Sequence, residues 1–182
     1  MKSTTPATVR DLYRVPEHGK AEIVDGELVL MSPTGALPSR ASGSIYASLR
    51  IYERARGGGL AYPDNAAFIV DLPRRKSFSP DAAFHRGTQP TMKFVEGAPV
   101  FAVEVRSEGD YGPRAERALA LKRADYFAAG TEVVWDVDLL SDDVIRVHRM
   151  SQAEPTIYRR GETAEAEPAV PGWTVPVDAL FE

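Results

Sequence analysis

The sequence contains no cysteine among its 182 residues. Disulfide bonds, thiolate zinc sites and a cysteine nucleophile are therefore excluded. Its three histidines, His18, His85 and His148, lie far apart and match no metal-ligand spacing, so each is expected to be an ordinary core or surface residue. The sequence also has no G-x-S-x-G elbow, phosphate-binding loop or dinucleotide fingerprint, which leaves an unrelated α/β enzyme such as a hydrolase without support.

Long apolar segments are absent as well. No apolar run approaches the roughly 20 residues that a membrane-spanning helix needs, and the first 20 residues lack the apolar core of a secretory signal. We therefore expect a cytoplasmic protein with no membrane segment. Hydrophobic residues make up 43% and charged residues 26%, as is usual for globular proteins. We expect residues 1–182 to form a single domain.

The net charge of −4 gives no overall attraction to nucleic acid. Two groups of basic residues stand out locally. One is the run from Arg74 to Lys76, and the other lies on a predicted helix and comprises Arg114, Arg117, Lys122 and Arg123. Each group fits either a solvated face or a local basic groove.

The order of predicted elements indicates an α/β (α+β) fold, with a central mixed β-sheet flanked by helices. The strand at 100–105, the following helix and the strand at 132–137 fit a parallel β-α-β unit. Asp25-Gly26 is a dipeptide typical of two-residue turns and predicts a hairpin over 21–31. The other predicted elements are helices at 9–14, 38–56 and 113–129, strands at 60–62, 66–70, 80–84 and 144–149, a polar loop at 74–79, and a hairpin with a packed tail over 155–182.

A carboxylate interrupts the apolar strand PVFAVEVRSE at 99–108. Because strand side chains alternate, Ala102, Glu104 and Arg106 share one face. A charge inside such a strand is costly unless it is paired or coordinated. Glu104 therefore either forms an ion pair with Arg106, lies at an exposed sheet edge, or serves as a metal ligand or general base.

Asp81 offers a second carboxylate near the start of a neighbouring predicted strand, directly after Pro80. Two adjacent strands can hold Asp81 and Glu104 facing each other. Two oxygen ligands without imidazole or thiolate suit Mg²⁺ or Mn²⁺ better than zinc.

Lys122 occupies an apolar position of the next helix. It lies in one helical stripe with Ala115, Leu119, Tyr126 and Ala129. Its side chain either extends along the apolar surface to solvent or reaches across the sheet to the two carboxylates.

The order PD, then E-x-R, then a lysine on the next helix resembles the PD-(D/E)XK nuclease superfamily. The chain is still more similar to the Uma-type family of bacterial restriction-endonuclease-like proteins. The resemblance covers most of the chain through AEIVDGELVLMSP, SPDAAF, VFAVEVRSEGD, KRADYFAAGTEVVWDVD, VIRVHR and PGWTVPVDALF. It implies a restriction-endonuclease-like core and metal-dependent hydrolysis of DNA.

The resemblance also implies roles for particular residues. Asp81 and Glu104 would bind the divalent metal, and the backbone carbonyl of Val105 would complete the protein's ligands. Glu22 matches an acidic residue that assists metal or water binding, although it also fits a solvent-facing strand position. Lys122 would orient the attacking water and offset charge on the phosphate.

Arg106 departs from the superfamily pattern, which has lysine at this position. Arginine stays charged and can only donate hydrogen bonds, although it can clamp a phosphate oxygen. The segment SEGD at 107–110 departs in the adjacent loop. These departures keep a second function open, a catalytically inactive nuclease-fold protein that binds nucleic acid or acts as an accessory. A homodimer is expected, with one active site per DNA strand.

Overall fold

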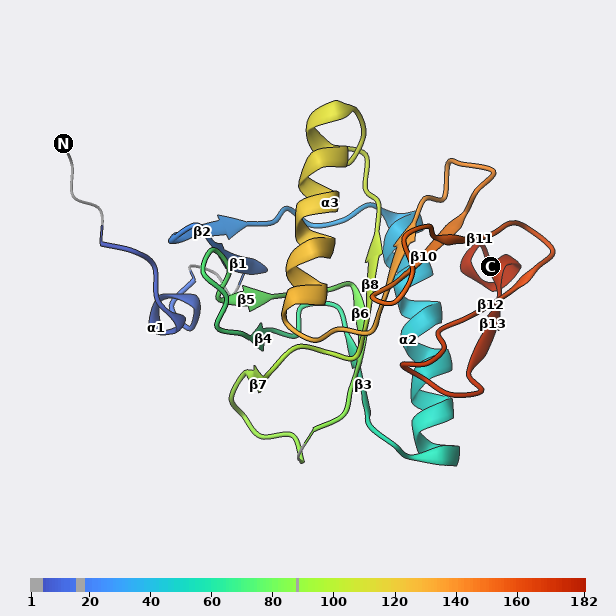
Figure 1. Cartoon of the computed structure of the whole chain (residues 1–182), viewed down its shortest axis with the longest axis horizontal. Coiled ribbons are helices and arrows are strands. Elements are labelled where there is room, and N and C mark those ends of the chain that lie inside the picture. Colours follow the sequence, from blue (N-terminus) through green and yellow to red (C-terminus); the bar gives the residue numbers. More distant parts are fainter. Residues whose placement is uncertain (1–4, 16–18, 88) are drawn as a thin grey trace.

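A six-stranded mixed sheet forms the centre of the computed structural model, with helix α3 on one face and helix α2 on the other (Figure 1). The structure describes residues 5–15, 19–87 and 89–182. Its helices are α1 (Val9–Leu12), α2 (Ala36–Arg56), α3 (Pro113–Ala128) and the 3-10 helix η2 (Val177–Leu180). Its strands are β1 (Ala21–Val24), β2 (Glu27–Leu30), β3 (Leu60–Pro63), β4 (Phe68–Ile69), β5 (Ser77–Phe78), β6 (Ala82–His85), β7 (Val95–Glu96), β8 (Phe101–Val105), β9 (Val133–Val137), β10 (Ile145–Arg149), β11 (Thr156–Tyr158), β12 (Thr163–Glu165) and β13 (Thr174–Pro176).

The order of strands across the sheet is β11-β10-β9-β8-β6-β3. Strands β8 and β9 pair in parallel through the crossover helix α3, as predicted from the sequence. Strand β6 pairs antiparallel with β8, with Ala82 opposite Val103. The predicted fold class, a mixed sheet flanked by helices, is thus confirmed, and β8 lies inside the sheet rather than at its edge.

The face of the sheet under α2 forms the larger apolar core. Ile45 and Leu49 of α2 pack there with Phe101 and Trp135. Trp173 from the C-terminal tail joins this core, with its ring centroid 5.2 Å from that of Trp135. The prediction that the tail packs back onto the domain is therefore confirmed.

The opposite face, under α3, has a smaller apolar core. Ala102 and Val134 of the sheet contact Tyr126 of α3, whose ring stacks on Phe78 at 4.0 Å. Glu104 belongs to this face because side chains alternate along β8. A carboxylate placed here must find polar partners.

A hairpin of β1 and β2 lies beside this second face (Figure 1). Its turn residues Asp25 and Gly26 have φ values of 50° and 78°, as the predicted two-residue turn requires. Strand β1 is joined to the segment before β6, because the Ile23 amide donates to Ser77 Oγ at 2.9 Å. This contact places β1, and with it Glu22, next to α3.

The structure corrects several predicted boundaries. The segment 74–79, predicted to be a polar loop, contains the short strand β5, and both of its residues are fully buried. The strand predicted over 66–70 is shortened to β4, and a further short strand, β7, pairs with it in parallel. Within the described residues, no helix combines the length and apolar character that crossing a membrane requires.

Candidate active site

The pairing of β6 with β8 brings Asp81 and Glu104 together. Asp81 directly precedes β6, and its amide donates to the Val103 carbonyl at 2.9 Å. Its Oδ2 accepts a hydrogen bond from the Val105 amide at 2.8 Å. Because Ala82 lies opposite Val103, Asp81 comes opposite Glu104. The predicted juxtaposition of the two carboxylates is therefore present.

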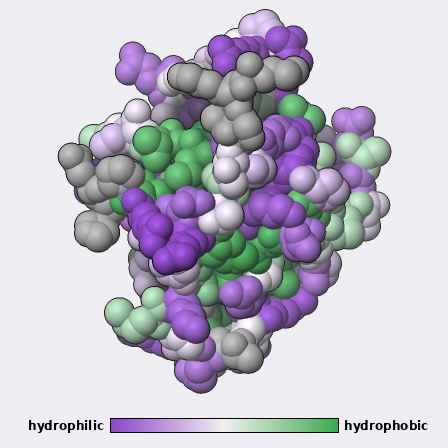
Figure 2. Space-filling view, turned by 90° about the vertical axis from the view of Figure 1, so that its left-hand side faces the viewer, coloured by the Kyte–Doolittle hydropathy of each residue, from purple (hydrophilic) through white to green (hydrophobic). Residues whose placement is uncertain are grey.

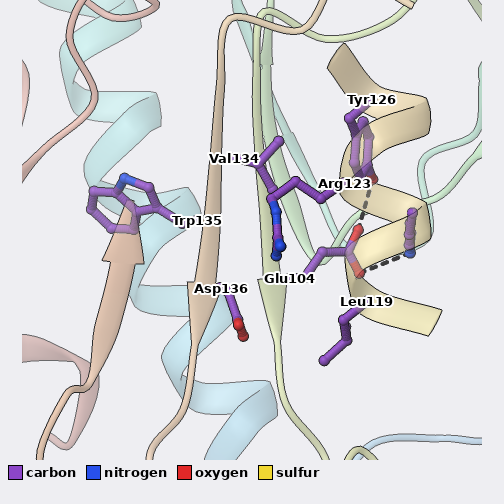
Figure 3. Close-up of a pocket in the computed structure, with 8 residues that line it drawn as sticks. Glu104, Leu119, Arg123, Tyr126, Val134, Trp135 and Asp136 are labelled. Carbon is purple, nitrogen blue, oxygen red and sulfur yellow. Dashed lines mark hydrogen bonds and ion pairs between the residues drawn. The ribbon is translucent and has the colours of Figure 1, made fainter. Parts of the chain in front are cut away.

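Glu104 points from the sheet toward α3 and Tyr126 (Figure 3). Its Oε1 accepts a hydrogen bond from the Tyr126 hydroxyl at 2.7 Å, and its Oε2 accepts one from Lys122 Nζ at 2.8 Å. Of the two orientations predicted for Lys122, the structure has the one in which the ammonium reaches across to Glu104, whereas Asp81 is paired with Lys20. This follows from the α3 stripe, since Lys122 and Tyr126 are one helical turn apart and face the same strand.

Glu22 is the third carboxylate of the site. It is only 4% exposed, so its interpretation as a solvent-facing strand residue is wrong. Its Oε1 lies 2.9 Å from Lys122 Nζ and accepts a hydrogen bond from the Ser79 amide at 2.9 Å. Lys122 therefore bridges Glu22 of the hairpin and Glu104 of the central sheet.

Arg75 fixes Glu22 in this arrangement, a role that the sequence, which offered Arg75 only as part of a basic run, did not indicate. Its Nη1 donates to Glu22 Oε2 at 2.5 Å, and its Nε donates to Asp125 Oδ2 of α3 at 2.8 Å. It is 5% exposed, so a solvated face is the wrong interpretation for this residue. Its neighbour Arg74 pairs with Asp25. A buried arginine within a polar run has no sequence signal that distinguishes it from an exposed one.

Lys20 and Asp64 form an ion-pair network with Asp81, and neither of them was identified from the sequence as a site residue. Lys20 Nζ lies 2.7 Å from Asp81 Oδ1 and 2.7 Å from Asp64 Oδ1. Asp64 follows β3, which pairs with β6. The contact is thus created by sheet order, which the polar residues alone do not reveal.

The charges of the site shift the pKa values of its members in opposite directions. Burial raises the pKa of Glu104 to about 7, with added contributions from the charges of Asp81 and Glu22, while Lys122 opposes the rise. Burial alone would raise the pKa of Glu22, but the charges of Lys122 and Arg75 outweigh it and lower that pKa. Burial lowers the pKa of Lys122, but Glu104 and Glu22 reverse the effect and raise it, so the ammonium stays protonated at neutral pH.

Arg106 directly follows β8, and its side chain binds partners other than Glu104. Its Nε and Nη2 each donate to one oxygen of Asp136 at 2.7 Å. It also binds Glu116 of α3 through both terminal nitrogens. Among the described residues, Arg106 therefore pairs with Asp136 and Glu116, and not with Glu104 as one interpretation of the sequence had it.

A cavity of about 10 Å³, enough for about one water molecule, separates the two networks. Its lining includes Glu104 and Lys122 of one network, Asp136 of the other, and Arg123 of α3. The four basic residues predicted on α3 therefore fall into two pairs with different surroundings. Lys122 and Arg123 face this cavity, whereas Arg114 and Arg117 are exposed.

Asp81 and Glu104 fit a hard divalent cation by the chemistry of their donors. Both supply carboxylate oxygens, and their mutual repulsion contributes to the raised pKa of Glu104, which a divalent cation would relieve. No group of three or more His, Cys, Asp or Glu side chains suited to a metal occurs in the parts of the chain that the structure describes. A Mg²⁺ ion held by one or two carboxylates and otherwise by water needs no such group. His18 lies outside the described residues.

An open groove of about 270 Å³ adjoins the site on the α1 side. Its walls include Tyr13 and Phe94, whose rings stack at 3.8 Å, and Gly19, Asn65 and Ser79. Gly19 and Asn65 are the chain neighbours of Lys20 and Asp64, and Ser79 lies two residues before Asp81, so the groove approaches the site through these neighbouring residues. Figure 2 shows this side of the molecule, where hydrophobic surface lies between hydrophilic regions.

The mixed sheet, with its carboxylates on neighbouring strands and a lysine on the crossover helix, defines a restriction-endonuclease-like protein. The chain belongs to the Uma2 family, whose model matches residues 7–178 and is described as "Putative restriction endonuclease". The chain also resembles a crystal structure of a "putative nuclease belonging to DUF820" from Anabaena variabilis. The TM-score is 0.75 at 14% identity, with 97% of this chain and 98% of the other covered. This likeness supports the fold. Comparison with curated proteins gave no match.

Proposed function

We propose that the protein is a metal-dependent endonuclease that hydrolyses phosphodiester bonds in DNA. The observation that carries this proposal is the convergence of Asp81, directly before β6, with Glu104 of β8 and Lys122 of α3, in a chain of the Uma2 family. Asp81 and Glu104 would hold Mg²⁺ or Mn²⁺, with the Val105 carbonyl as a further ligand. The bound ion would polarise the scissile phosphate and lower the pKa of a bound water.

Lys122 supplies positive charge to the same reaction. Because its pKa is raised, it acts as a hydrogen-bond donor and not as a general base. Its ammonium orients the water or offsets the charge that develops on the phosphate oxygens. Glu22 and, through Glu22, Arg75 hold this ammonium next to Glu104.

Access to the site supports a polymeric substrate. The side chains of Asp81 and Glu104 keep 19% and 15% of their surface exposed, so they are only partly buried and a ligand can reach them. The groove that approaches the site gives a DNA strand room next to the scissile phosphate, and its Tyr13–Phe94 wall offers aromatic surface to a base.

A second candidate function is a nuclease-fold protein that binds nucleic acid without cleaving it. Arg106 favours it, because this residue stands where the superfamily has lysine and its guanidinium is engaged by Asp136 and Glu116. In that arrangement both hydrogens of Nη2, the Nε hydrogen and one hydrogen of Nη1 are engaged by carboxylates, so Arg106 cannot offer a phosphate a two-pronged contact. For the endonuclease, cleavage then depends on Lys122 as the lysine of the site.

The homodimer, the single domain and the cytoplasmic location remain parts of this proposal. A homodimer would supply one site for each DNA strand. Light scattering at tens of micromolar protein should give twice the monomer mass of 19.9 kDa. A monomer at that concentration would remove the dimer from the proposal.

The proposal is tested by incubating supercoiled and linear DNA with the protein and Mg²⁺ or Mn²⁺. The wild-type protein should cleave, whereas Asp81→Asn and Glu104→Gln should not. Asp71→Asn is the matched control, because Asp71 forms an exposed ion pair with Lys76. Cleavage that persists in the first two variants would refute the assignment. Metal binding without any cleavage by the wild type would favour the second candidate.

A further inference from the structure

We propose that Lys20 is a built-in competitor for the metal position at Asp81, and that Asp64 receives its ammonium when a divalent cation binds. Both residues would then be positioning residues of the site. The inference rests on the metal site of the proposed function. It adds a defined movement of the Lys20 side chain, which in the structure contacts both Asp81 and Asp64.

The contacts of Asp81 carry the first step. Its Oδ2 accepts a hydrogen bond from the Val105 amide, which fixes the carboxylate to β8. Its other oxygen, Oδ1, accepts a hydrogen bond from Lys20 Nζ at 2.7 Å. The oxygen left for a cation is thus the one that Lys20 holds. A divalent cation and an ammonium repel each other and therefore compete for this oxygen.

The position of Asp64 carries the second step. Its Oδ1 lies as close to Lys20 Nζ as Asp81 does, at 2.7 Å. The Asp64 side chain is 41% exposed, compared with 19% for Asp81. Lysine carries its charge on a flexible four-carbon stem. Lys20 can therefore leave Asp81 toward the surface while it keeps one carboxylate partner and avoids becoming an unpaired charge.

Two other roles for Asp64 make different predictions. If Asp64 binds the metal directly, its effect on affinity should persist or grow when Lys20 is removed, since Asp64 is then freed. If Asp64 and Lys20 form only a structural ion pair, their removal should change stability and leave metal affinity unchanged. The competitor role predicts tighter binding without Lys20 together with an Asp64 effect that shrinks in that background.

Calorimetric titration with Mn²⁺ separates these roles. Lys20→Met should bind Mn²⁺ about tenfold more tightly than the wild type, a size usual for coupling between sites. Asp64→Asn should bind several-fold more weakly, because Lys20 then depends on Asp81 alone. In the Lys20→Met background, the fold-loss of Mn²⁺ affinity caused by Asp64→Asn should be smaller than in the wild type, by a factor of about three or more.

Lys76→Met is the matched control, since Lys76 pairs with Asp71 at the surface, and its Mn²⁺ affinity should equal that of the wild type. Circular dichroism establishes that each variant is folded. An unchanged or weaker affinity in Lys20→Met would overturn the inference, as would an Asp64→Asn effect of equal size in both backgrounds. Wild-type protein that binds no Mn²⁺ would also overturn it.

The inference and the proposed function can fail separately. Wild-type protein that binds Mn²⁺ with the predicted Lys20 and Asp64 effects but cleaves no DNA would refute the endonuclease and support the inference. Metal-dependent cleavage combined with an unchanged Mn²⁺ affinity in Lys20→Met would do the reverse.

Discussion

Glu104 should make the stability of the protein fall as pH rises through neutrality. Its pKa is about 7 in the folded protein, compared with an ordinary value of 4.5. As pH rises above about 4.5, the unfolded chain releases this proton first, so the free energy of unfolding decreases until the folded protein also ionises near pH 7. The two pKa values correspond to about 3 kcal/mol in total, most of which is lost between pH 5 and pH 8.

Glu104→Gln isolates this effect, because glutamine keeps the size of the side chain and cannot ionise. Urea unfolding of both proteins at pH 5 and pH 8 should show that the wild type loses about 2–3 kcal/mol more than the variant. Saturating Mn²⁺ at pH 8 should stabilise the wild type, since a ligand that binds only the folded state raises its stability. The same pH dependence in both proteins would refute the reasoning about Glu104.

Further predictions concern the surrounding charges. Arg75→Met should lower the free energy of unfolding by about 3–5 kcal/mol, measured in urea, because it leaves Glu22 and Asp125 buried with one partner fewer. Arg106→Lys should lower it by about 1–3 kcal/mol, since lysine cannot reproduce the two-pronged contacts of the guanidinium. Lys122→Met should reduce the DNA cleavage rate about 100-fold or more without abolishing Mn²⁺ binding in calorimetry. Chelation of divalent ions with EDTA should abolish cleavage, and added Mg²⁺ should restore it.

Much of the fold and the centre of the site could be predicted from the sequence because they depend on short-range patterns. Alternation along 100–105 placed Glu104 on a defined face of a strand. Helical spacing placed Lys122 on the side of α3 that faces the sheet. The β-α-β order then made β8 and β9 parallel neighbours. These rules are local, so the sequence alone was sufficient to apply them.

The partners of these residues could not be predicted in the same way. Arg75 meets Glu22 and Asp125 only because the hairpin docks beside β5 and α3. Arg106 pairs with Asp136 because β9 lies next to β8 in a particular register. Polar residues in such positions are indistinguishable in sequence from solvated ones, and only the tertiary arrangement decides which carboxylate each cation contacts.

The central claim is that Asp81 and Glu104 share one divalent cation. A crystal structure of the protein soaked with Mn²⁺, analysed by anomalous scattering, tests it most directly. The account predicts one manganese peak with carboxylate oxygens of both residues at about 2.2 Å, close to the bond lengths of similar hard cations, and the Lys122 ammonium nearby. A fully soaked crystal with no peak between these two carboxylates, or with manganese bound elsewhere, would contradict it.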